Sequence, residues 1–467
     1  MSERPAQNSR VAVVGGGLAG LAAGCALADS GFRVTLFERR PYLGGRASSY
    51  QHPGTGEVVD NCQHVLLGCC TNLIQFYERL GVEDKIRWYE RLTFLEPGGR
   101  ASVIEPSGLP APLHNTAAFL GADCLNFSDK LSIAVVMAAL APALPRDSGE
   151  SFLTWLHRHR QTEQAIEHFW KPVLVSALNE ELDRVSVCYA AQVVRESFLK
   201  SAAAGRMGVP TVPLTDLYSV AGDYITARDG EIRVRSGVES FSSGPDTVTL
   251  LASDEELTFD FVVFAVSFDV MSRILPQTPD AESLRQVLAR FETSPITGIH
   301  LWFDRQITDL DHAVLLDRTI QWMFHKSKLL GRNENGNASY VELVVSSSKT
   351  LVEKSRAEIV ELALAELREF FPGAREANLV KSTVIKEVHA TYSPRPGVDV
   401  FRPRPETAWP RVFLAGDWTA TGWPATMEGA VRSGYLAAES VARAAGMRDA
   451  SFLVPNLPAT GLMRLFG

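Results

Sequence analysis

The spacing of hydrophobic and polar positions changes several times along the chain and divides it into segments of different character. Short uninterrupted apolar runs, typical of buried parallel strands, occur within residues 10–70, about 216–275 and 410–445. Residues 115–205 instead repeat apolar positions at helical spacing, and residues 290–395 alternate strand-like runs with one amphipathic helix, "SRAEIVELALAELREFF". This order predicts an α/β domain assembled from three separate segments, with a second lobe inserted between them.

The expected boundaries follow from these changes. We expect the α/β domain at residues 10–85, 216–275 and 410–445, a helical subdomain at 86–215, a strand-rich subdomain at 276–409 and an apolar tail at 446–467. The 467 residues, 46% hydrophobic and 21% charged, have the composition of a folded globular protein with two or three lobes. The longest apolar run, "LSIAVVMAALAPALP", is shorter than the roughly 20 residues that span a bilayer. We interpret this run as a buried or membrane-facing helix.

The first segment carries a glycine pattern typical of dinucleotide binding. In "RVAVVGGGLAGLAAGCALADSGFRVTLFERR", three glycines in GxGxxG spacing follow a strand and open a helix, and an acid ends the second strand 18 residues after the last of these glycines. The glycines allow a tight turn, a close approach of the backbone to a pyrophosphate and close packing of helix on strand, while the acid can bond the adenosine ribose. The residues expected around this part of the cofactor are Gly15, Gly17, Leu18, Ala19, Gly20 and Glu38.

A second glycine loop follows in "RRPYLGGRASSY", where a cation beside paired glycines is suited to brace the same pyrophosphate. This pattern resembles the FAD-binding signature of the flavin amine oxidase and phytoene desaturase superfamily. The resemblance implies a discontinuous Rossmann-like FAD-binding domain of the glutathione-reductase type, with an inserted α+β substrate lobe that includes a helical subdomain. It also implies non-covalently bound FAD, with Arg39, Gly45 and Arg46 among the cofactor-binding residues and Val238, in the strand expected within "GEIRVRSGVESF", near the adenine.

The stretch "LAGDWTATGWPATMEGAVRSG" near the C-terminus has more glycine, acid and Trp than a strand-to-helix turn needs. In the superfamily such a strand ends in Gly-Asp, and the next helix presents its N-terminus to the flavin ring, where its dipole stabilises negative charge. The resemblance thus implies that Gly416 and Asp417 hold the ribityl chain and that Met427 and Ala430 begin the helix at the ring. No second GxGxxG is present, so we expect the flavin to exchange electrons with a substrate or an external electron donor.

Two further stretches are similar to one group of this superfamily. "VVDNCQHVLLGCCTNLIQFYERLG" and the C-terminal stretch resemble the squalene-associated hydroxysqualene dehydroxylases of bacterial hopanoid synthesis, and "FWKPVLVSALNEELDRVSV" resembles their central helical region. The resemblance implies reduction of hydroxysqualene to squalene, with hydride from reduced FAD delivered to the carbon that loses hydroxide. The chain departs from the usual pattern at Cys62, where the group usually has Gly, so this thiol either alters the ring environment or points away from it.

Loss of hydroxide requires an acid near the hydroxyl group and a dry apolar tunnel. His64 lies, by chain order, where the superfamily lines the flavin face, and Glu428 lies at a helix N-terminus, so both are candidate general acids. Each also has a structural alternative. His64 can hydrogen-bond the backbone or the flavin, and Glu428 can stabilise the start of its helix.

Aromatic and polar residues, many of them in the inserted regions, are the candidates for contact with an apolar substrate. "SFLTWLHRHRQTEQAIEHFW" and "IQWMFHKSK" supply Trp and Phe for a tunnel, although aromatic residues at helical spacing usually belong to the core. The expected substrate contacts are Gln63, Trp170, Asn179, Trp322 and Trp423. The histidines of the helical segment do not form HExxH, so we expect no metal site.

Charge and termini bear on partners and location. The net charge of −8 argues against nucleic-acid binding, and the six cysteines form no CxxC pair, so we expect free thiols in a reducing compartment. The N-terminus "MSERPAQNSR" lacks the apolar core of a signal peptide, which favours a cytoplasmic location. The tail "SFLVPNLPATGLMRLFG" is suited to a membrane surface, at its inner face, to packing on the protein or to a contact between two copies.

Two other classes of function fit the same sequence. One is a related flavin oxidoreductase, such as a carotenoid or phytoene-type desaturase or an amine oxidase. The other is a non-catalytic isoprenoid-binding protein on the same fold. For the dehydroxylase interpretation, the expected partners are a hydrophobic C30 isoprenoid and an external electron donor.

Overall fold

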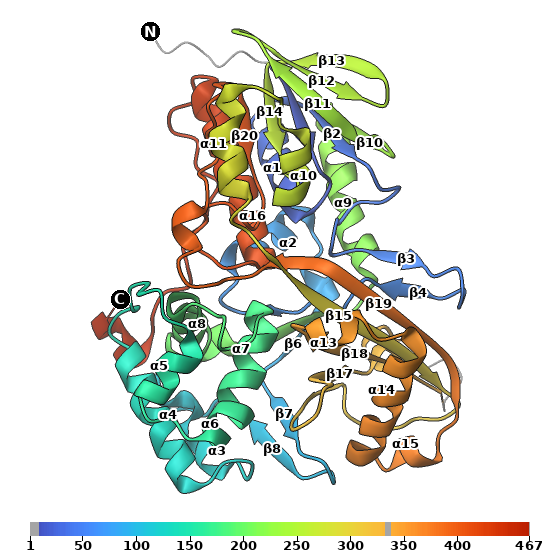
Figure 1. Ribbon diagram of the computed structural model, residues 1–467, viewed down its shortest axis with the longest axis vertical. Coiled ribbons are helices and arrows are strands. Elements are labelled where there is room, and N and C mark those ends of the chain that lie inside the picture. The colour runs from blue at the N-terminus through green and yellow to red at the C-terminus, as the bar shows by residue number, and fades with distance from the viewer. Residues whose placement is uncertain (1–8, 332–337, 467) are drawn as a thin grey trace.

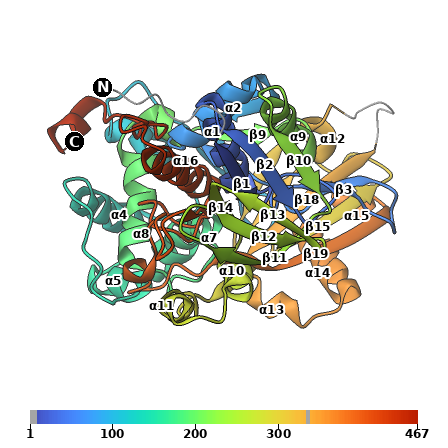
Figure 2. The same ribbon diagram turned by 90° about the horizontal axis from the view of Figure 1, so that it is seen from above.

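The computed structural model describes residues 9–331 and 338–466, so the polar residues 1–8 and the last residue of the tail lie outside the described residues. An α/β unit forms one end of the molecule, and a large mixed sheet lies beside a group of helices at the other end (Figure 1). Seen from above in Figure 2, the C-terminal helix α16 (Met427–Ala444) lies beside α1 (Leu18–Asp29) of the N-terminal segment. The two ends of the sequence therefore meet in one unit.

The α/β unit is built on a five-stranded parallel sheet in the order β10-β2-β1-β14-β20. Its strands are β1 (Arg10–Val14), β2 (Arg33–Glu38), β10 (Glu231–Val234), β14 (Phe261–Phe264) and β20 (Val412–Leu414). Eleven of the twelve residues of α1 are buried, because this helix packs on the sheet, on α16 and on α9 (Leu214–Thr226). Strands from three distant segments thus form one sheet, and the Rossmann-like fold expected from the sequence is confirmed.

A small antiparallel sheet departs from the sequence-based expectation. We expected one strand within "GEIRVRSGVESF", but β10 ends at Val234 and β11 begins at Val238. Arg235 between them has a left-handed φ of 56°, so the chain turns out of the first sheet at this point. The three strands of the small sheet are β11 (Val238–Ser243), β12 (Val248–Ala252) and β13 (Glu255–Phe259).

The second lobe contains a seven-stranded mixed sheet in the order β19-β15-β18-β17-β16-β7-β8. Its strands are β7 (Leu92–Leu95), β8 (Ala101–Ile104), β15 (Thr293–Phe303), β16 (His312–Leu315), β17 (Trp322–Phe324), β18 (Ser339–Ser346) and β19 (Leu379–Tyr392). Since β7 and β8 belong to this sheet, residues 86–215, which we expected as a helical subdomain, contribute strands as well as helices. The same range also supplies β6 (Ile86–Tyr89) and β9 (Met207–Pro210), which pair with each other beside β5 (Leu66–Leu67).

The two faces of the seven-stranded sheet have different surroundings because side chains alternate along each strand. Ile299 and Leu301 of β15 belong to an apolar cluster with residues of α14 (Arg356–Phe370), which covers that face. Gly298 of β15 instead adjoins the segment of residues 60–64, which follows the α/β unit's second glycine loop. The second face of the sheet is therefore turned toward the candidate site.

The helical group lies beside this sheet. Its helices are α3 (Thr116–Gly121), α4 (Phe127–Leu140), α5 (Phe152–Arg158), α6 (Glu163–Ala165), α7 (Lys171–Leu178) and α8 (Val187–Val194). The remaining elements used below are α2 (Thr71–Leu80) and the C-terminal 3-10 turn η7 (Gly461–Phe466). No helix within residues 9–331 and 338–466 has both the length and the hydrophobicity needed to cross a membrane.

Candidate functional site

Two glycine loops meet at the N-terminus of α1. Gly15 has a left-handed φ of 111°, and a Cβ on Gly20 would lie 1.9 Å from the Gly15 carbonyl oxygen, so strand and helix approach as closely as the backbone allows. In the second loop the Gly44 amide donates to the Gly16 carbonyl at 2.8 Å, and a Cβ on Gly45 would lie 2.9 Å from the Cα of Gly17. Side chains are thus excluded from both loops, and backbone amides at the helix start, including those of Leu18 and Ala19, have no partner within the helix.

Glu38 lies at the carboxyl end of β2, next to this cradle. Its carboxylate accepts hydrogen bonds from the backbone amides of Gly16 at 2.8 Å and Arg40 at 2.7 Å, which hold the side chain at the edge of the first glycine loop. The exposed Arg39 runs past Gly237, where a Cβ would lie 3.5 Å from its Cγ. Glu38, the predicted ribose-binding acid, and Gly237, the residue before Val238, therefore lie close together at the carboxyl end of β2.

Arg46 connects three segments that are distant in sequence. Its guanidinium forms an ion pair with Asp417 (Nη2 to Oδ1, 2.8 Å) and donates from Nη1 to the Ala390 carbonyl of β19 at 2.6 Å. Gly416 has a left-handed φ of 141°, and its amide donates to the Ser433 hydroxyl of α16 at 2.8 Å. The predicted pyrophosphate and ribityl residues are therefore brought together although about 370 residues separate them.

The N-terminus of α16 is held from several directions. The Thr426 hydroxyl caps it by accepting from the Gly429 amide at 3.1 Å, one residue before Ala430, and the Tyr218 hydroxyl lies 3.5 Å from the sulfur of Met427. Glu428 is fully buried, and its carboxylate accepts from the amides of Asn72 and Leu73 at the start of α2 and from the Asn72 side chain.

The contacts of Glu428 therefore do not favour it over other groups as the general acid for which it was one candidate. Burial raises its pKa, while the donors of α2 oppose that shift, and its oxygens serve to join two helix N-termini. The structural alternative for this residue fits the contacts better.

The segment of residues 60–64 crosses the second face of the seven-stranded sheet. The Asn61 side-chain amide donates to the Arg46 carbonyl and to Glu387, both at 3.1 Å, so the segment starts beside the second glycine loop. A Cβ on Gly298 would lie 3.7 Å from the sulfur of Cys62, which shows that the thiol lies over a strand position without a side chain. The space for Cys62 is thus provided by Gly298 of β15.

His64 has one ring nitrogen fixed by the backbone. Its Nδ1 lies 2.7 Å from the Cys62 carbonyl, and because a carbonyl oxygen only accepts hydrogen bonds, Nδ1 carries the proton and Nε2 of the neutral ring is an acceptor. Burial lowers the pKa of His64, which favours this neutral form at pH 7. The His64 ring therefore makes the backbone hydrogen bond of its structural alternative, and its neutral form leaves Nε2 as an acceptor rather than a proton donor.

A buried charged cluster anchors this segment to the sheet, and the sequence reasoning missed it. The Lys326 ammonium, 2% exposed, donates to Asp60 at 2.6 Å and to the Gln63 side-chain oxygen at 2.7 Å, and it lies 3.6 Å from Glu342 of β18. Gln63 also donates to the His64 carbonyl at 3.0 Å, so both ends of its amide are engaged within the protein rather than free for substrate. The signals that would have found the cluster are Lys326, two residues after the apolar run "WMF", and the single charge within "ASYVELVVSS".

Glu342 differs from the other members of the cluster because its carboxylate has no hydrogen-bond partner among the described residues. It is fully buried, and neither carboxylate oxygen accepts a hydrogen bond of normal geometry from any residue that the structure describes. Burial raises its pKa to about 8, with the Lys326 ammonium opposing the shift only in part. Glu342 is therefore largely protonated at neutral pH, and Lys326 and Asp60 are left as the charged pair.

An apolar wall adjoins the segment of residues 60–64. Trp322 and Phe324 of β17 stack with ring centroids 5.5 Å apart, and the Trp322 indole donates to the Ser176 hydroxyl of α7 at 2.7 Å. The residues that pack together here are Cys62, Met207, Val209, Phe324, Leu329 and Val344, with Val65, Leu67, Tyr89, Leu92, Ile296 and Trp322 partly buried at its border. Trp322 is thus the predicted substrate contact that the structure places on this wall.

The other predicted substrate contacts have structural roles. Trp170 is fully buried, and its indole donates to Gln161 at 2.8 Å within the core of the helical group. Asn179 ends α7 with a left-handed φ of 52°; its side chain donates to β15 and β19 and accepts from the Ser347 amide at 2.7 Å. Trp423 is 6% exposed and packs under the Arg432 guanidinium in the core of the α/β unit. Burial and these packing contacts account for the positions of these three residues, and their contact with substrate stays a prediction.

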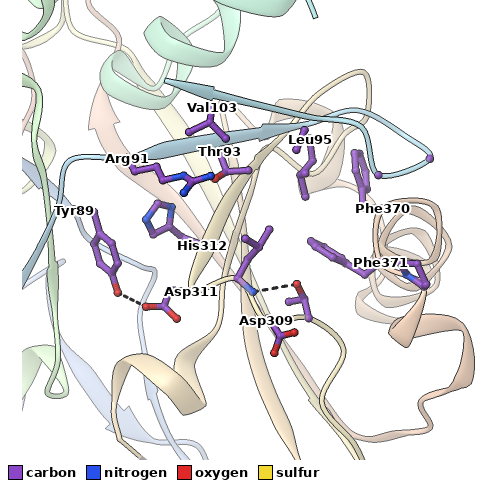
Figure 3. Close-up of a pocket in the computed structure, with 16 residues that line it drawn as sticks. Tyr89, Arg91, Thr93, Leu95, Val103, Asp309, Asp311, His312, Phe370 and Phe371 are labelled. Carbon is purple, nitrogen blue, oxygen red and sulfur yellow. Dashed lines mark hydrogen bonds between the residues drawn. The ribbon is translucent and has the colours of Figure 1, made fainter. Parts of the chain in front are cut away.

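A groove of about 700 Å³ lies on the outer side of this wall, between β7 and β8 and the end of α14 (Figure 3). The Tyr89 hydroxyl donates to Asp311 at 2.7 Å, and its ring meets the His312 ring edge-on at 4.6 Å. Tyr89 also packs against the apolar wall, and the His312 ring lies 6.5 Å from that of Trp322. Tyr89 and His312 therefore separate the groove from the apolar wall.

This combination of a parallel sheet, a cradle of close-packed glycines at a helix N-terminus and a distant Asp paired with the loop cation defines a dinucleotide-binding flavoprotein. The family model described as flavin containing amine oxidoreductase matches residues 18–442, and the chain belongs to this family. Its cofactor is FAD, and the glycine cradle, Glu38, Arg46 and Asp417 are the residues that fit it. The chain is a flavin-dependent oxidoreductase.

Several known proteins are similar over nearly the whole chain. The 15-cis-phytoene desaturase of Synechococcus elongatus is 27% identical over 460 residues, covering 92% of this chain and 95% of the relative. The chloroplastic/chromoplastic 15-cis-phytoene desaturase of Narcissus pseudonarcissus is 27% identical, covering 94% of this chain and 80% of the relative. The solved structure of putrescine oxidase bound to putrescine superposes with a TM-score of 0.73 at 17% identity, covering 93% and 99% of the two chains, and this likeness concerns the fold alone.

Proposed function

We propose that this protein is an FAD-dependent oxidoreductase that acts on a long isoprenoid hydrocarbon, and that its reaction is the desaturation of a phytoene-type polyene. The similarity to phytoene desaturases over more than nine-tenths of the chain supports this direction of chemistry. The apolar wall of Trp322, Phe324 and their neighbours supports a hydrocarbon substrate, because it offers dispersion contacts and excludes water. The observation that carries the proposal is the neutral His64, which has an accepting nitrogen and lies in sequence between Cys62 and Val65, two residues of this wall.

Desaturation removes a hydride and a proton from adjacent carbons and leaves a new C=C bond. Oxidised FAD supplies the hydride acceptor when it is bound. His64 is the candidate for the proton acceptor, since its Nε2 is unprotonated and its ring is oriented by the Cys62 carbonyl. The contacts of Lys326 with Asp60 and Gln63 orient the segment that carries His64.

A second candidate is the reductive dehydroxylation of hydroxysqualene to squalene, which the stretches at residues 58–81 and 414–434 favour by their resemblance to hydroxysqualene dehydroxylases. That reaction needs a proton donor for the departing hydroxyl and an external electron donor for the flavin. The neutral His64 does not fit the role of donor. Glu342, protonated near neutral pH and 3.6 Å from Lys326, is the acid that the cluster offers for it.

Anaerobic half-reactions with the purified FAD-loaded protein distinguish the candidates. For a desaturase, phytoene in detergent should bleach the oxidised flavin near its main visible band, and the product should contain one or more new double bonds. For a dehydroxylase, hydroxysqualene should reoxidise dithionite-reduced flavin with formation of squalene. Reduction of the flavin by putrescine or another amine, with neither isoprenoid reacting, would refute an isoprenoid substrate. Flavin that is inert to all three classes would favour the non-catalytic binding role.

A His64→Gln variant tests the proposed proton acceptor. Since Gln cannot take a proton at neutral pH, we expect slower flavin reduction by phytoene with unchanged FAD affinity. An unchanged rate would remove His64 from the mechanism and leave the substrate assignment to the half-reactions.

A further inference from the structure

The helical group exposes an uninterrupted apolar surface. Between residues 131 and 144, every exposed position is Leu, Ala, Val or Pro, and the run contains no charged residue. Phe127, Leu131 and Val135 follow one another at four-residue spacing on α4 and are 75%, 57% and 56% exposed. The sequence left open whether this helix is buried or faces a membrane. The structure buries one side of α4, through residues such as Ile133 and Val136, and leaves the opposite side apolar and exposed.

Two other apolar segments are attached next to α4. Arg195 donates from Nε to the Ala141 carbonyl, just after α4, and from Nη2 to the Phe466 carbonyl of η7. The Leu462 amide of η7 donates to the Ala111 carbonyl at 2.8 Å, beside the exposed Leu109 and Leu113. Figures 1 and 2 both show α4 and the C-terminal end on the same side of the molecule. The exposed apolar side chains that these segments gather are Leu109, Leu113, Leu120, Phe127, Leu131, Val135, Leu144, Leu462, Leu465 and Phe466.

We propose that this apolar surface, made by residues 109–113, α3, α4 and η7, docks the protein on a lipid membrane that contains anionic headgroups. Interfacial helices insert Leu and Phe into the acyl boundary and keep cations at headgroup level. Here Lys130, Arg146 and Arg464 adjoin the apolar residues in sequence, against the two exposed acids Asp123 and Asp147. An interface between two copies would combine apolar contacts with hydrogen-bonding groups, which the exposed positions from 131 to 144 do not provide. Phe127 and Leu465, at 75% and 78% exposure, stand out as side chains suited to insertion.

Docking through this apolar surface would also bring the enzyme to an apolar substrate dissolved in the membrane, and this part of the inference rests on the proposed function. A long isoprenoid hydrocarbon is dissolved in lipid rather than in water, so an enzyme that uses it gains from lying at the bilayer surface. Docking itself depends only on the exposed side chains and the cations that adjoin them in sequence. It can therefore be tested separately from catalysis.

The test uses the full-length FAD-loaded protein and vesicles of phosphatidylcholine with phosphatidylglycerol. The variant Phe127→Ser, Leu131→Ser, Leu465→Ser removes three exposed apolar side chains. The matched control, Val380→Ser with Val400→Ser, removes two that are 61% and 80% exposed outside the surface. We expect the triple variant to lose at least about tenfold in vesicle partitioning by flotation, and the control to bind like the wild type. The flavin spectrum and melting temperature check that each protein is folded.

Equal partitioning of the triple variant and the wild type, or no binding of the wild type, would overturn the proposal. A wild-type dimer in light scattering that becomes monomeric in the triple variant would also overturn it, in favour of an interface between two copies. Oxidation of detergent-dispersed phytoene at the same rate by wild type and triple variant shows whether the proposed function stands. A failure of docking and a failure of the proposed function therefore give different results.

Discussion

Replacement of Lys326 by Met should show how strongly the buried charged cluster stabilises the protein. Met removes the ammonium with little loss of apolar volume. The ammonium is 2% exposed and is the counter-charge of Asp60, so its loss leaves a buried carboxylate without a cation. Breaking a buried ion pair from one side costs about 3–5 kcal/mol.

We expect the low end of this range for Lys326→Met. Asp60 keeps its hydrogen bonds from the Ser49 hydroxyl and the Leu214 amide at 3.2 Å, and Glu342 is already largely neutral, so one uncompensated charge remains rather than two. The free energy of unfolding should therefore fall by about 3 kcal/mol, measured by urea unfolding followed by Trp fluorescence.

Two comparisons make this expectation specific. Adding Asp60→Asn to Lys326→Met removes the stranded charge while keeping an acceptor, and it should restore about 1–2 kcal/mol. Lys381→Met removes one partner of a half-exposed ion pair with Glu57 and should cost less than about 1 kcal/mol. If Lys326→Met costs no more than Lys381→Met, or if the second substitution restores nothing, the argument that Lys326 holds a buried charge in place is refuted.

Three further outcomes are expected. Arg46→Ala should weaken FAD binding about tenfold or more, measured by titration of the apoprotein through flavin fluorescence, because it removes a charged donor and leaves Asp417 unpaired. Glu428→Gln should lower the free energy of unfolding by about 1–3 kcal/mol but leave the rate of flavin reduction unchanged, and a large loss of rate would return Glu428 to the candidate acids. Because the pKa of Glu342 is raised to about 8 in the folded state, the folded protein holds this proton where the unfolded chain has lost it, so the contribution of Glu342 to stability should fall as pH rises from about 4.5 to about 8. Glu342→Gln should flatten that dependence, which is at most about 1.4 kcal/mol per pH unit, and identical pH profiles of unfolding for the two proteins would contradict the assignment.

The parts of the site that the sequence predicts are those whose chemistry is local. The glycine spacing around Gly15 and Gly20 identifies the cradle, because at each of these positions the backbone approaches another backbone segment too closely for a side chain. The close approach at Gly20 lies within one strand–turn–helix unit, so the sequence pattern reports it directly. Asp417 required the family resemblance, since nothing local relates it to Arg46. Lys326 and Glu342 were missed because Lys326, just after β17, contacts both Glu342 of β18 and Asp60, which are distant from it in sequence.

The differences between expectation and structure have a common physical origin. Helical spacing of aromatic residues indicates which side of a helix is buried, but does not say whether protein or substrate covers that side. The side chain of Trp170 is covered by the protein itself. In the same way, a polar residue in a motif can satisfy backbone groups rather than bind a ligand, as Asn179 does at the junction of α7 with the sheet. The strands β7 and β8 escaped notice because they are four residues each and lie at the far edge of a sheet formed mostly by residues after 290.

The contact between Arg46 and Asp417 sets an order of events during synthesis. The nascent chain can form the first glycine loop early, but the sheet lacks β20 and the cofactor site lacks Asp417 and α16 until the residues up to Ala444 have left the ribosome. The complete FAD site is therefore formed only after β20, Asp417 and α16 have been synthesised, and FAD then binds residues from distant parts of the chain at once. A ligand that binds the native state in this way shifts the equilibrium away from the unfolded chain. The supply of flavin in the cell should for this reason control how much of the newly made protein survives proteolysis.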